Sequence, residues 1–235
     1  MTTAPWTFVR LGMAALIAAA VATQLVHSIR FALASGTEYG SHVPTIVANF
    51  FSFFTVESNI VAAVALAVVA VRALRGRTGR EPAWVGTLFL AAATFMTITG
   101  LVYNTLLRFG PALLVGNTVS WANEVMHVVG PLFLLADALL ARHRALPWGA
   151  IGVVLAYPIA WVGYTLLRAE HVVSPATGSA WWYPYPFLNP HVQGGYGGVA
   201  LYVIGIAIAF GIVSTGILAL WRRRARIAAA APAAA

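Results

Sequence analysis

The sequence predicts an all-α polytopic membrane protein, a bundle of six transmembrane helices that forms a single domain over residues 1–227. Three observations support this fold class. The 235 residues are 60% hydrophobic and only 9% charged, whereas a soluble domain carries roughly 25% charged residues. Six apolar segments reach the length of about 20 residues that a span needs. The segments between them are rich in arginine or in Gly, Pro and aromatic residues, and none suits a soluble domain.

The six predicted spans follow one another along the chain and cover residues 8–33, 45–71, 84–107, 119–140, 147–167 and 197–221. The first is followed by "ALA" at 32–34, which also suits a cleaved signal peptide. Because His27, Ser28 and Arg30 are unusual before such a cleavage site, we expect the first span to be retained. We expect the Ala-rich tail, residues 228–235, to be disordered.

The distribution of basic residues predicts the orientation of the spans. All fourteen basic residues are arginines. With both termini in the cytoplasm, only Arg30, Arg108 and Arg168 lie outside, and eleven lie on the cytoplasmic side: Arg10, Arg72, Arg75, Arg77, Arg80, Arg142, Arg144, Arg222, Arg223, Arg224 and Arg226. Cytoplasmic loops carry the excess of basic residues. We therefore expect a multi-pass protein of the cell membrane, and no nucleic-acid partner despite the net charge of +8.

Polar residues inside the spans form stripes on a helical wheel of about 100° per residue. The stripe of the second span contains Thr45, Asn49, Ser52, Thr55 and Asn59. The third span groups Thr87, Thr94, Thr97, Asn104 and Arg108, and the fourth groups Ser120, Asn123, Glu124, His127, Pro131 and Asp137. Lipid is a poor solvent for such groups, so we expect the stripes to face one another around a cavity or a hydrogen-bonded core.

Two of these polar residues are expected at a similar depth in the outer half of the bilayer. At 1.5 Å per residue, Thr55 lies about 15 Å and His127 about 12 Å from the outer ends of their spans. A structural reading stays open for both residues. A threonine in a membrane helix often bonds the carbonyl four residues earlier, and a histidine can act simply as a hydrogen-bond partner between helices.

Two acidic residues have expected partners of their own. Glu57 points nearly opposite Thr55 on the wheel, which favours a neutral carboxyl or a partner such as Arg30. Asp137 is close to the cytoplasmic end of its span, where we expect it to pair with Arg142 or Arg144.

Several kinds of chemistry are excluded or disfavoured by the sequence. The absence of cysteine excludes disulfides and thiolate chemistry. No second histidine stands at metal-ligand spacing from His127, so we expect no metal and no other cofactor. The loop segment "GSAWWYPYPFLNPHVQ" before the last span is rich in aromatic residues and proline. Such a segment suits either an interfacial aromatic belt or a lid over a site.

Three segments, "FFSFFTVESN", "NEVMHVVGP" and "WWYPYPFL", resemble in order and separation the bacterial Pr-six-Pr proteins, a family of six-span membrane proteins. Through this family the chain is similar to the eukaryotic androgen-induced hydrolases, which include the androgen-dependent TFPI-regulating protein. The resemblance implies a threonine hydrolase that cleaves fatty acid esters of hydroxy fatty acids. Its nucleophile would be Thr55 and its histidine His127; Asn123 also fits, and the "YPFL" block falls on Tyr185 to Leu188. The extra "WWYP" and the nearer proline, Pro131, depart from the family pattern.

These observations lead to a hypothesis for function, an intramembrane hydrolase acting on a lipid ester. His127 would take the proton of the Thr55 hydroxyl and then protonate the leaving alcohol. Glu124 would orient His127, and the expected oxyanion donors are Asn59, Asn123 or Ser52. Asn104 and Tyr185 complete the supporting residues.

The main alternative is a small-solute or proton-coupled transporter or channel that uses Glu57, Glu124, His127 and Asp137. It requires a polar path through both halves of the membrane, and the lack of an internal repeat and of broken helices opposes it. An enzyme requires a pocket closed toward the cytoplasm, with the Thr55 hydroxyl within hydrogen-bond reach of His127. A membrane scaffold would pack its polar stripes together without a cavity.

Overall fold

The structure, a computed structural model, describes residues 4–76, 81–108 and 118–230. Its helices are α1 (Ala4–Leu33), α2 (Val43–Phe51), α3 (Phe54–Leu74), α4 (Ala83–Val102), α5 (Ser120–Glu124), α6 (Gly130–Leu140), α7 (Ala150–Ala169) and α8 (Tyr196–Ala230). Two π-helical segments, η1 (Tyr103–Leu107) and η2 (Val125–Val129), continue α4 and join α5 to α6, and a short 3-10 helix, η3 (Pro186–Leu188), lies in the loop before α8.

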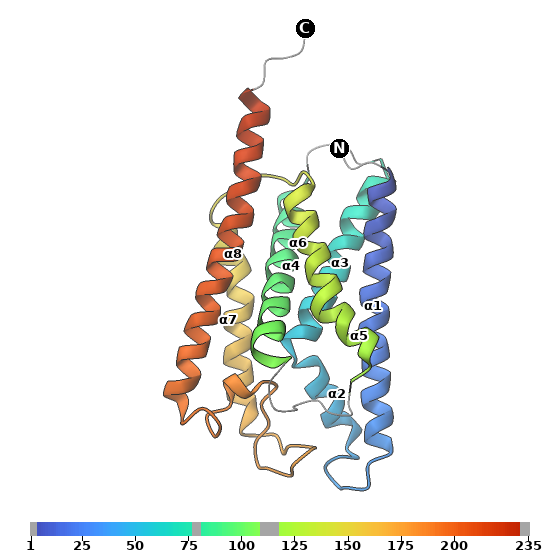
Figure 1. Ribbon diagram of the computed structural model, residues 1–235, viewed down its shortest axis with the longest axis vertical. Coiled ribbons are helices and arrows are strands. Elements are labelled where there is room, and N and C mark those ends of the chain that lie inside the picture. The colour runs from blue at the N-terminus through green and yellow to red at the C-terminus, as the bar shows by residue number, and fades with distance from the viewer. Residues whose placement is uncertain (1–3, 77–80, 109–117, 231–235) are drawn as a thin grey trace.

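The described residues contain helices and loops but no strand, and six helical segments are long and apolar enough to cross a membrane. The predicted all-α, six-span membrane bundle is therefore confirmed. The start of α1 and the end of α8 lie together at one end of the bundle (Figure 1), which we call the terminal end. The opposite end, the loop end, holds the connections over residues 34–42 and 170–195. The cytoplasmic location of the terminal end stays a prediction.

The second predicted span, residues 45–71, is two helices. α2 ends at Phe51 and α3 begins at Phe54, with extended backbone at Phe53 (φ −75°, ψ 124°). The break carries neither Gly nor Pro, so hydropathy and periodicity gave no sign of it. The absence of broken helices thus no longer opposes the transporter alternative.

The break is tolerated because aromatic side chains from other elements satisfy the backbone groups it frees. The Trp161 indole of α7 donates to the Ser52 carbonyl oxygen at 3.1 Å. The Thr55 N–H donates to the Tyr185 hydroxyl, also at 3.1 Å. Non-helical backbone at membrane depth requires such partners within the protein.

The other spans differ from prediction mainly at their ends. α7 begins at Ala150, three residues after the predicted start, and α8 continues to Ala230. Residues 228–230, assigned to the disordered tail from sequence, are therefore helical. Residues 231–235 of that tail lie outside the described residues.

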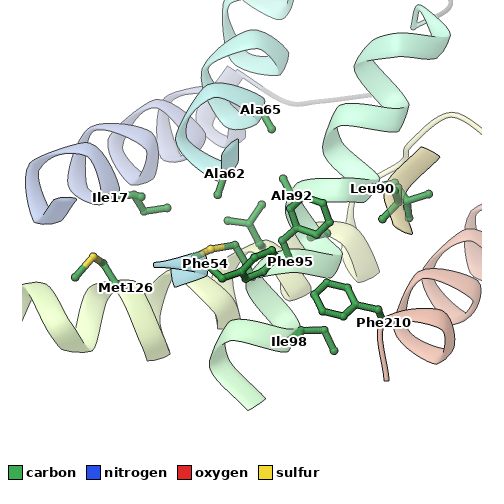
Figure 2. Close-up of a cluster of buried hydrophobic side chains, with 14 of the residues drawn as sticks. Ile17, Phe54, Ala62, Ala65, Leu90, Ala92, Phe95, Ile98, Met126 and Phe210 are labelled. Atoms are coloured by element: carbon green, nitrogen blue, oxygen red, sulfur yellow. The ribbon is translucent and has the colours of Figure 1, made fainter. Parts of the chain in front are cut away.

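α4 occupies the centre of the bundle and packs against α3, α6 and α8. Figure 2 shows Phe54, Phe95 and Phe210 meeting where α3, α4 and α8 come together, with ring centroids 5.5 to 6.0 Å apart. Gly100 permits a close crossing, because a Cβ there would stand 2.8 Å from Pro131 Cβ at the start of α6.

A buried ion pair holds the terminal end together, and it corrects the partner predicted for Asp137. Arg10 donates from Nε and Nη2 to the two Asp137 carboxylate oxygens, each at 2.7 Å, and Trp6 Nε1 adds a third bond at 3.0 Å. Arg144 donates instead to the Glu81 carbonyl. The planar guanidinium of α1 satisfies both carboxylate oxygens at once, which a tertiary approach of α1 to α6 makes possible.

Candidate active site

Thr55 lies in the first turn of α3, immediately after the break, with a side chain that is almost wholly buried. Its hydroxyl oxygen is 3.1 Å from the Tyr185 hydroxyl, which also accepts the Thr55 N–H. The structural reading, a bond to the carbonyl four residues earlier, does not describe Thr55. Thr97 of α4 shows that arrangement, donating to the Ala93 carbonyl at 2.7 Å.

Tyr185 reaches Thr55 from the loop between α7 and α8. Its ring packs against Phe53 and Phe187, with centroids 5.6 and 5.1 Å away. Burial raises the pKa of Tyr185 to about 12, so its hydroxyl is protonated at neutral pH and can donate a hydrogen bond. The aromatic loop segment therefore brings the Tyr185 hydroxyl to Thr55. This contact fits the lid alternative better than the interfacial aromatic belt.

His127 lies in the π-helical segment η2 and is buried. Pro131, four residues later, has no N–H, so the His127 carbonyl loses its usual helical donor. The Asn104 side-chain amide replaces that donor at 3.1 Å. Asn104 itself belongs to η1, and π-helical segments occur frequently at functional sites.

The orientation of the His127 ring follows from one hydrogen bond. Its Nδ1 is 2.9 Å from the Asn123 carbonyl oxygen, and since a carbonyl only accepts, Nδ1 carries the proton. In the neutral ring Nε2 is then the basic nitrogen. The Tyr103 ring stacks on the imidazole with centroids 3.9 Å apart, and Asn123 Nδ2 donates to the Tyr103 hydroxyl at 2.6 Å.

Asn59 connects the Thr55 and His127 segments. Its amide nitrogen donates to the Thr55 carbonyl at 2.8 Å and to the carbonyl of Met126, the residue before His127, at 3.1 Å. Asn59 thereby brings the α3 segment that begins near Thr55 next to η2. The predicted depth of about 15 Å for Thr55 assumed one unbroken helix, whereas Thr55 lies in the first turn of α3. Both donors of the Asn59 amide are used by these bonds, so Asn59 joins α3 to η2 and is not free to bind an oxyanion.

A cavity of about 190 Å³ opens beside Thr55. The hydroxyl-bearing residues of its lining are Thr55, Thr99, Tyr103 and Tyr185. Phe54 and residues of α7 and α8 supply apolar side chains. Tyr103 thus lines the cavity and also stacks on the His127 ring. Tyr103 and Thr99 were not predicted from the sequence. A wheel drawn for a straight α-helix misplaces Tyr103, which begins the π-helical segment η1, whereas Thr99 belongs to α4 and gave no local signal.

Among the described residues, no hydrogen bond joins Thr55 to His127. The Thr55 hydroxyl contacts Tyr185, the His127 Nδ1 contacts Asn123, and Tyr103 lies between the ring and the cavity. The expected direct contact is therefore not made in this conformation. A water molecule, a substrate or a small movement of Tyr103 is needed to pass a proton between the two residues.

Two supporting residues have partners that differ from those predicted. Glu124 pairs with Arg108 at 2.8 Å near the surface, so the group that orients His127 is the Asn123 carbonyl. Ser52 donates to the Ala48 carbonyl and meets the Tyr164 hydroxyl of α7 at 3.0 Å. Ser52 therefore contacts α7, whereas the Thr55 hydroxyl contacts Tyr185 of the loop before α8.

Glu57 follows Thr55 by two residues in α3, and its carboxylate acts electrostatically on the Tyr185 hydroxyl. The neighbour of Glu57 is the Tyr157 hydroxyl of α7, in place of the suggested Arg30. No group of three or more potential metal ligands occurs in the described part of the chain.

Comparisons with models of known protein families, with curated proteins and with solved structures found no match for this chain.

Proposed function

We propose that the protein is an integral membrane hydrolase that cleaves a lipid ester, with Thr55 as nucleophile and His127 as general base. The observation that carries the proposal is the position of the Thr55 hydroxyl. It stands at the polar end of an otherwise apolar cavity, held by a protonated tyrosine, and Asn59 joins its helix to the segment of a histidine whose basic nitrogen is Nε2. The resemblance of the three sequence segments points to the same two residues.

In the first step the Thr55 Oγ1 attacks the ester carbonyl carbon, and its proton passes to His127 Nε2. Two hydroxyls that border the cavity, those of Tyr185 and Tyr103, are the available donors for the resulting oxyanion. They replace Asn59 and Ser52 in that role. The carbon–oxygen bond to the alcohol then breaks, and the imidazolium returns the proton to the leaving alkoxide.

In the second step water hydrolyses the acyl-threonine. His127 Nε2 takes a proton from the water as its oxygen attacks the acyl carbon. The bond to Thr55 Oγ1 breaks, the proton moves to Oγ1, and the fatty acid is released. The substrate class proposed is an ester with a long acyl chain, because α7 and α8 line the cavity with hydrocarbon. We place the site in the extracytoplasmic half of a cell-membrane protein, following the arginine distribution.

The test is covalent labelling of the purified protein in detergent with an alkyl fluorophosphonate, which transfers its phosphonyl group to an activated hydroxyl with loss of fluoride. We expect labelling at Thr55 that is lost in Thr55→Ala and His127→Ala. Thr97→Ala is the matched control, because its hydroxyl bonds only its own helix. If the wild-type protein is not labelled and hydrolyses no acyl ester, the proposal is wrong.

The transporter alternative gains one observation, the break in the second span, since broken helices are common at transporter substrate sites. Against it, the cavity ends on the aromatic cluster of Phe54, Phe95 and Phe210, and beyond it the Arg10–Asp137 pair fills the terminal end. A pH-dependent solute flux in proteoliposomes that survives Thr55→Ala would favour transport.

A further inference from the structure

α7 and α8 form one part of the wall of the cavity beside Thr55, together with α4, η1 and the loop before α8. Along α7 the lining residues are Leu155, Pro158, Ile159, Trp161 and Val162, and along α8 they are Val203, Ile206, Ala207 and Phe210. Apart from Trp161, each set has the spacing i, i+3, i+4, i+7 of a single helix face. The cavity therefore runs for about 10 Å along both helices, seven residues at 1.5 Å each.

We infer that this cavity is an acyl-chain site filled directly from the bilayer, through a mouth between α7 and α8 at Ile159 and Ala207. The inference rests on the proposed function and specifies its substrate, an ester that resides in the membrane. None of the described residues that line the cavity is charged. A hydrated or ionic ligand would lose its water without compensation there, whereas a hydrocarbon chain would not.

The mouth is identified by exposure. Most lining residues are buried or half-buried, but Ile159 is 67% exposed and Ala207 is also exposed. In a membrane bundle an exposed apolar side chain at this depth faces lipid. The small side chain of Ala207 keeps the mouth open on the α8 side.

Pro158 adds a reason for the mouth to lie at this level of α7. It is in the interior of the helix and lines the cavity. Because proline lacks an N–H, the helical hydrogen bond to the Val154 carbonyl cannot form. α7 can thus bend next to the mouth without breaking that bond, which suits the passage of a chain.

The inner end of the cavity is the aromatic cluster. Phe210 and Phe54 line the cavity, while Phe95, the next aromatic residue toward the terminal end, lies behind them and does not. Their rings are in edge contact at 5.5 to 6.0 Å, and Figure 2 shows Phe210 reaching from α8 toward Phe54 and Phe95. A chain that enters at Ala207 is stopped there.

The experiment closes the mouth and measures lipid occupancy without relying on hydrolysis. The wild-type protein, Ala207→Trp and Ile208→Trp are reconstituted in phosphatidylcholine vesicles that contain a diazirine-bearing palmitate, irradiated and digested. We expect mass spectrometry to find adducts on cavity residues of α7 and α8. We expect Ala207→Trp to lose about tenfold in these adducts, equivalent to 1.4 kcal/mol of binding.

Ile208→Trp is the matched control, because Ile208 is 57% exposed on the same helix and does not line the cavity. Its adducts should equal those of the wild type. Ile159→Trp narrows the mouth from the α7 side and provides a second variant should Ala207→Trp misfold. Wild-type adducts outside the cavity, or full labelling of both mouth variants, would overturn the inference.

The labelling result and the hydrolase proposal can fail separately. Mouth-dependent adducts in a protein that hydrolyses no ester and gives no fluorophosphonate product would support the chain site and refute the hydrolase. Thr55-dependent hydrolysis of a palmitoyl ester that proceeds at wild-type rate in both mouth variants would support the hydrolase and refute the mouth.

Discussion

The hydroxyl of Tyr185 is 3.1 Å from both the backbone nitrogen and the side-chain oxygen of Thr55. A residue of the loop before α8 thus closes a break in a membrane helix 130 residues earlier in the chain. The same contact positions the proposed nucleophile and supplies a donor beside it.

We predict that Tyr185→Phe lowers kcat for ester hydrolysis by about 10²-fold, the usual cost of losing one oxyanion donor. The phenylalanine ring keeps the contacts with Phe53 and Phe187, so KM should change little. The Thr55 N–H loses its acceptor, which should lower the free energy of unfolding by about 1 to 3 kcal/mol. Tyr202→Phe, which alters an exposed hydroxyl of α8, serves as the control. A Tyr185→Phe protein with wild-type kcat would show that the hydroxyl only supports the helix break.

Asn104→Leu should destabilise the protein by about 1 to 2 kcal/mol, because the His127 carbonyl loses the donor that replaces its helical partner. The readout is thermal unfolding in detergent, together with the rate of fluorophosphonate labelling. Adding Pro131→Ala restores an N–H four residues after His127, and the double variant should recover part of both losses. If the double variant recovers neither stability nor labelling rate, the hydrogen bond from Asn104 to the His127 carbonyl is not the cause of the two losses.

The buried pair at the terminal end gives a prediction for stability alone. Arg10→Met or Asp137→Leu should each cost about 3 to 5 kcal/mol, since either change leaves an unpaired charge in a buried place. The double variant should be more stable than both single variants, because no charge remains. Losses that simply add in the double variant would contradict this explanation.

His143 gives a prediction for pH. It lies outside the spans, stacked between the Phe89 and Trp221 rings at 4.3 and 4.6 Å. Burial lowers the pKa of His143 from 6.5 to about 4, although Asp137 opposes this and Arg10 and Arg224 act in the same direction as burial. Between these two values the unfolded chain binds the proton and the folded protein does not. The contribution of neutral His143 to the free energy of unfolding is therefore complete above pH 6.5. It decreases by about 3 kcal/mol in all as the pH falls from 6.5 to about 4.

The measurement is the melting temperature in detergent from pH 7.5 to 4. His143→Phe, which keeps an aromatic ring between Phe89 and Trp221, should lose less of its melting temperature on acidification than the wild type. Equal pH profiles for the two proteins would show that His143 does not titrate on unfolding.

Phe210→Leu should move the preference of the hydrolase toward longer acyl chains, because it extends the inner end of the cavity. The measurement is kcat/KM across a series of acyl esters of increasing length. Phe95→Leu is the matched control: it thins the same aromatic cluster from a position that does not line the cavity. An unchanged chain-length profile in Phe210→Leu, or the same change in Phe95→Leu, would contradict the proposed inner end.

The sequence by itself determined the fold class and the six apolar helices long enough to cross a membrane, although not the break within the second predicted span. Hydropathy and helical periodicity are local properties, and both survive folding because lipid requires long, internally hydrogen-bonded helices.

Only the tertiary structure decided which partners the polar residues take. The break at Phe53 has no local signal, because it depends on Trp161 and Tyr185, which arrive from distant segments. Pro131 has no N–H, so it leaves the His127 carbonyl without its helical donor. That Asn104 supplies the replacement follows only from the packing of the bundle. Arg10 likewise reaches Asp137 across the bundle. A buried polar group takes whichever partner packing brings within about 3 Å, and packing is a property of the assembled bundle.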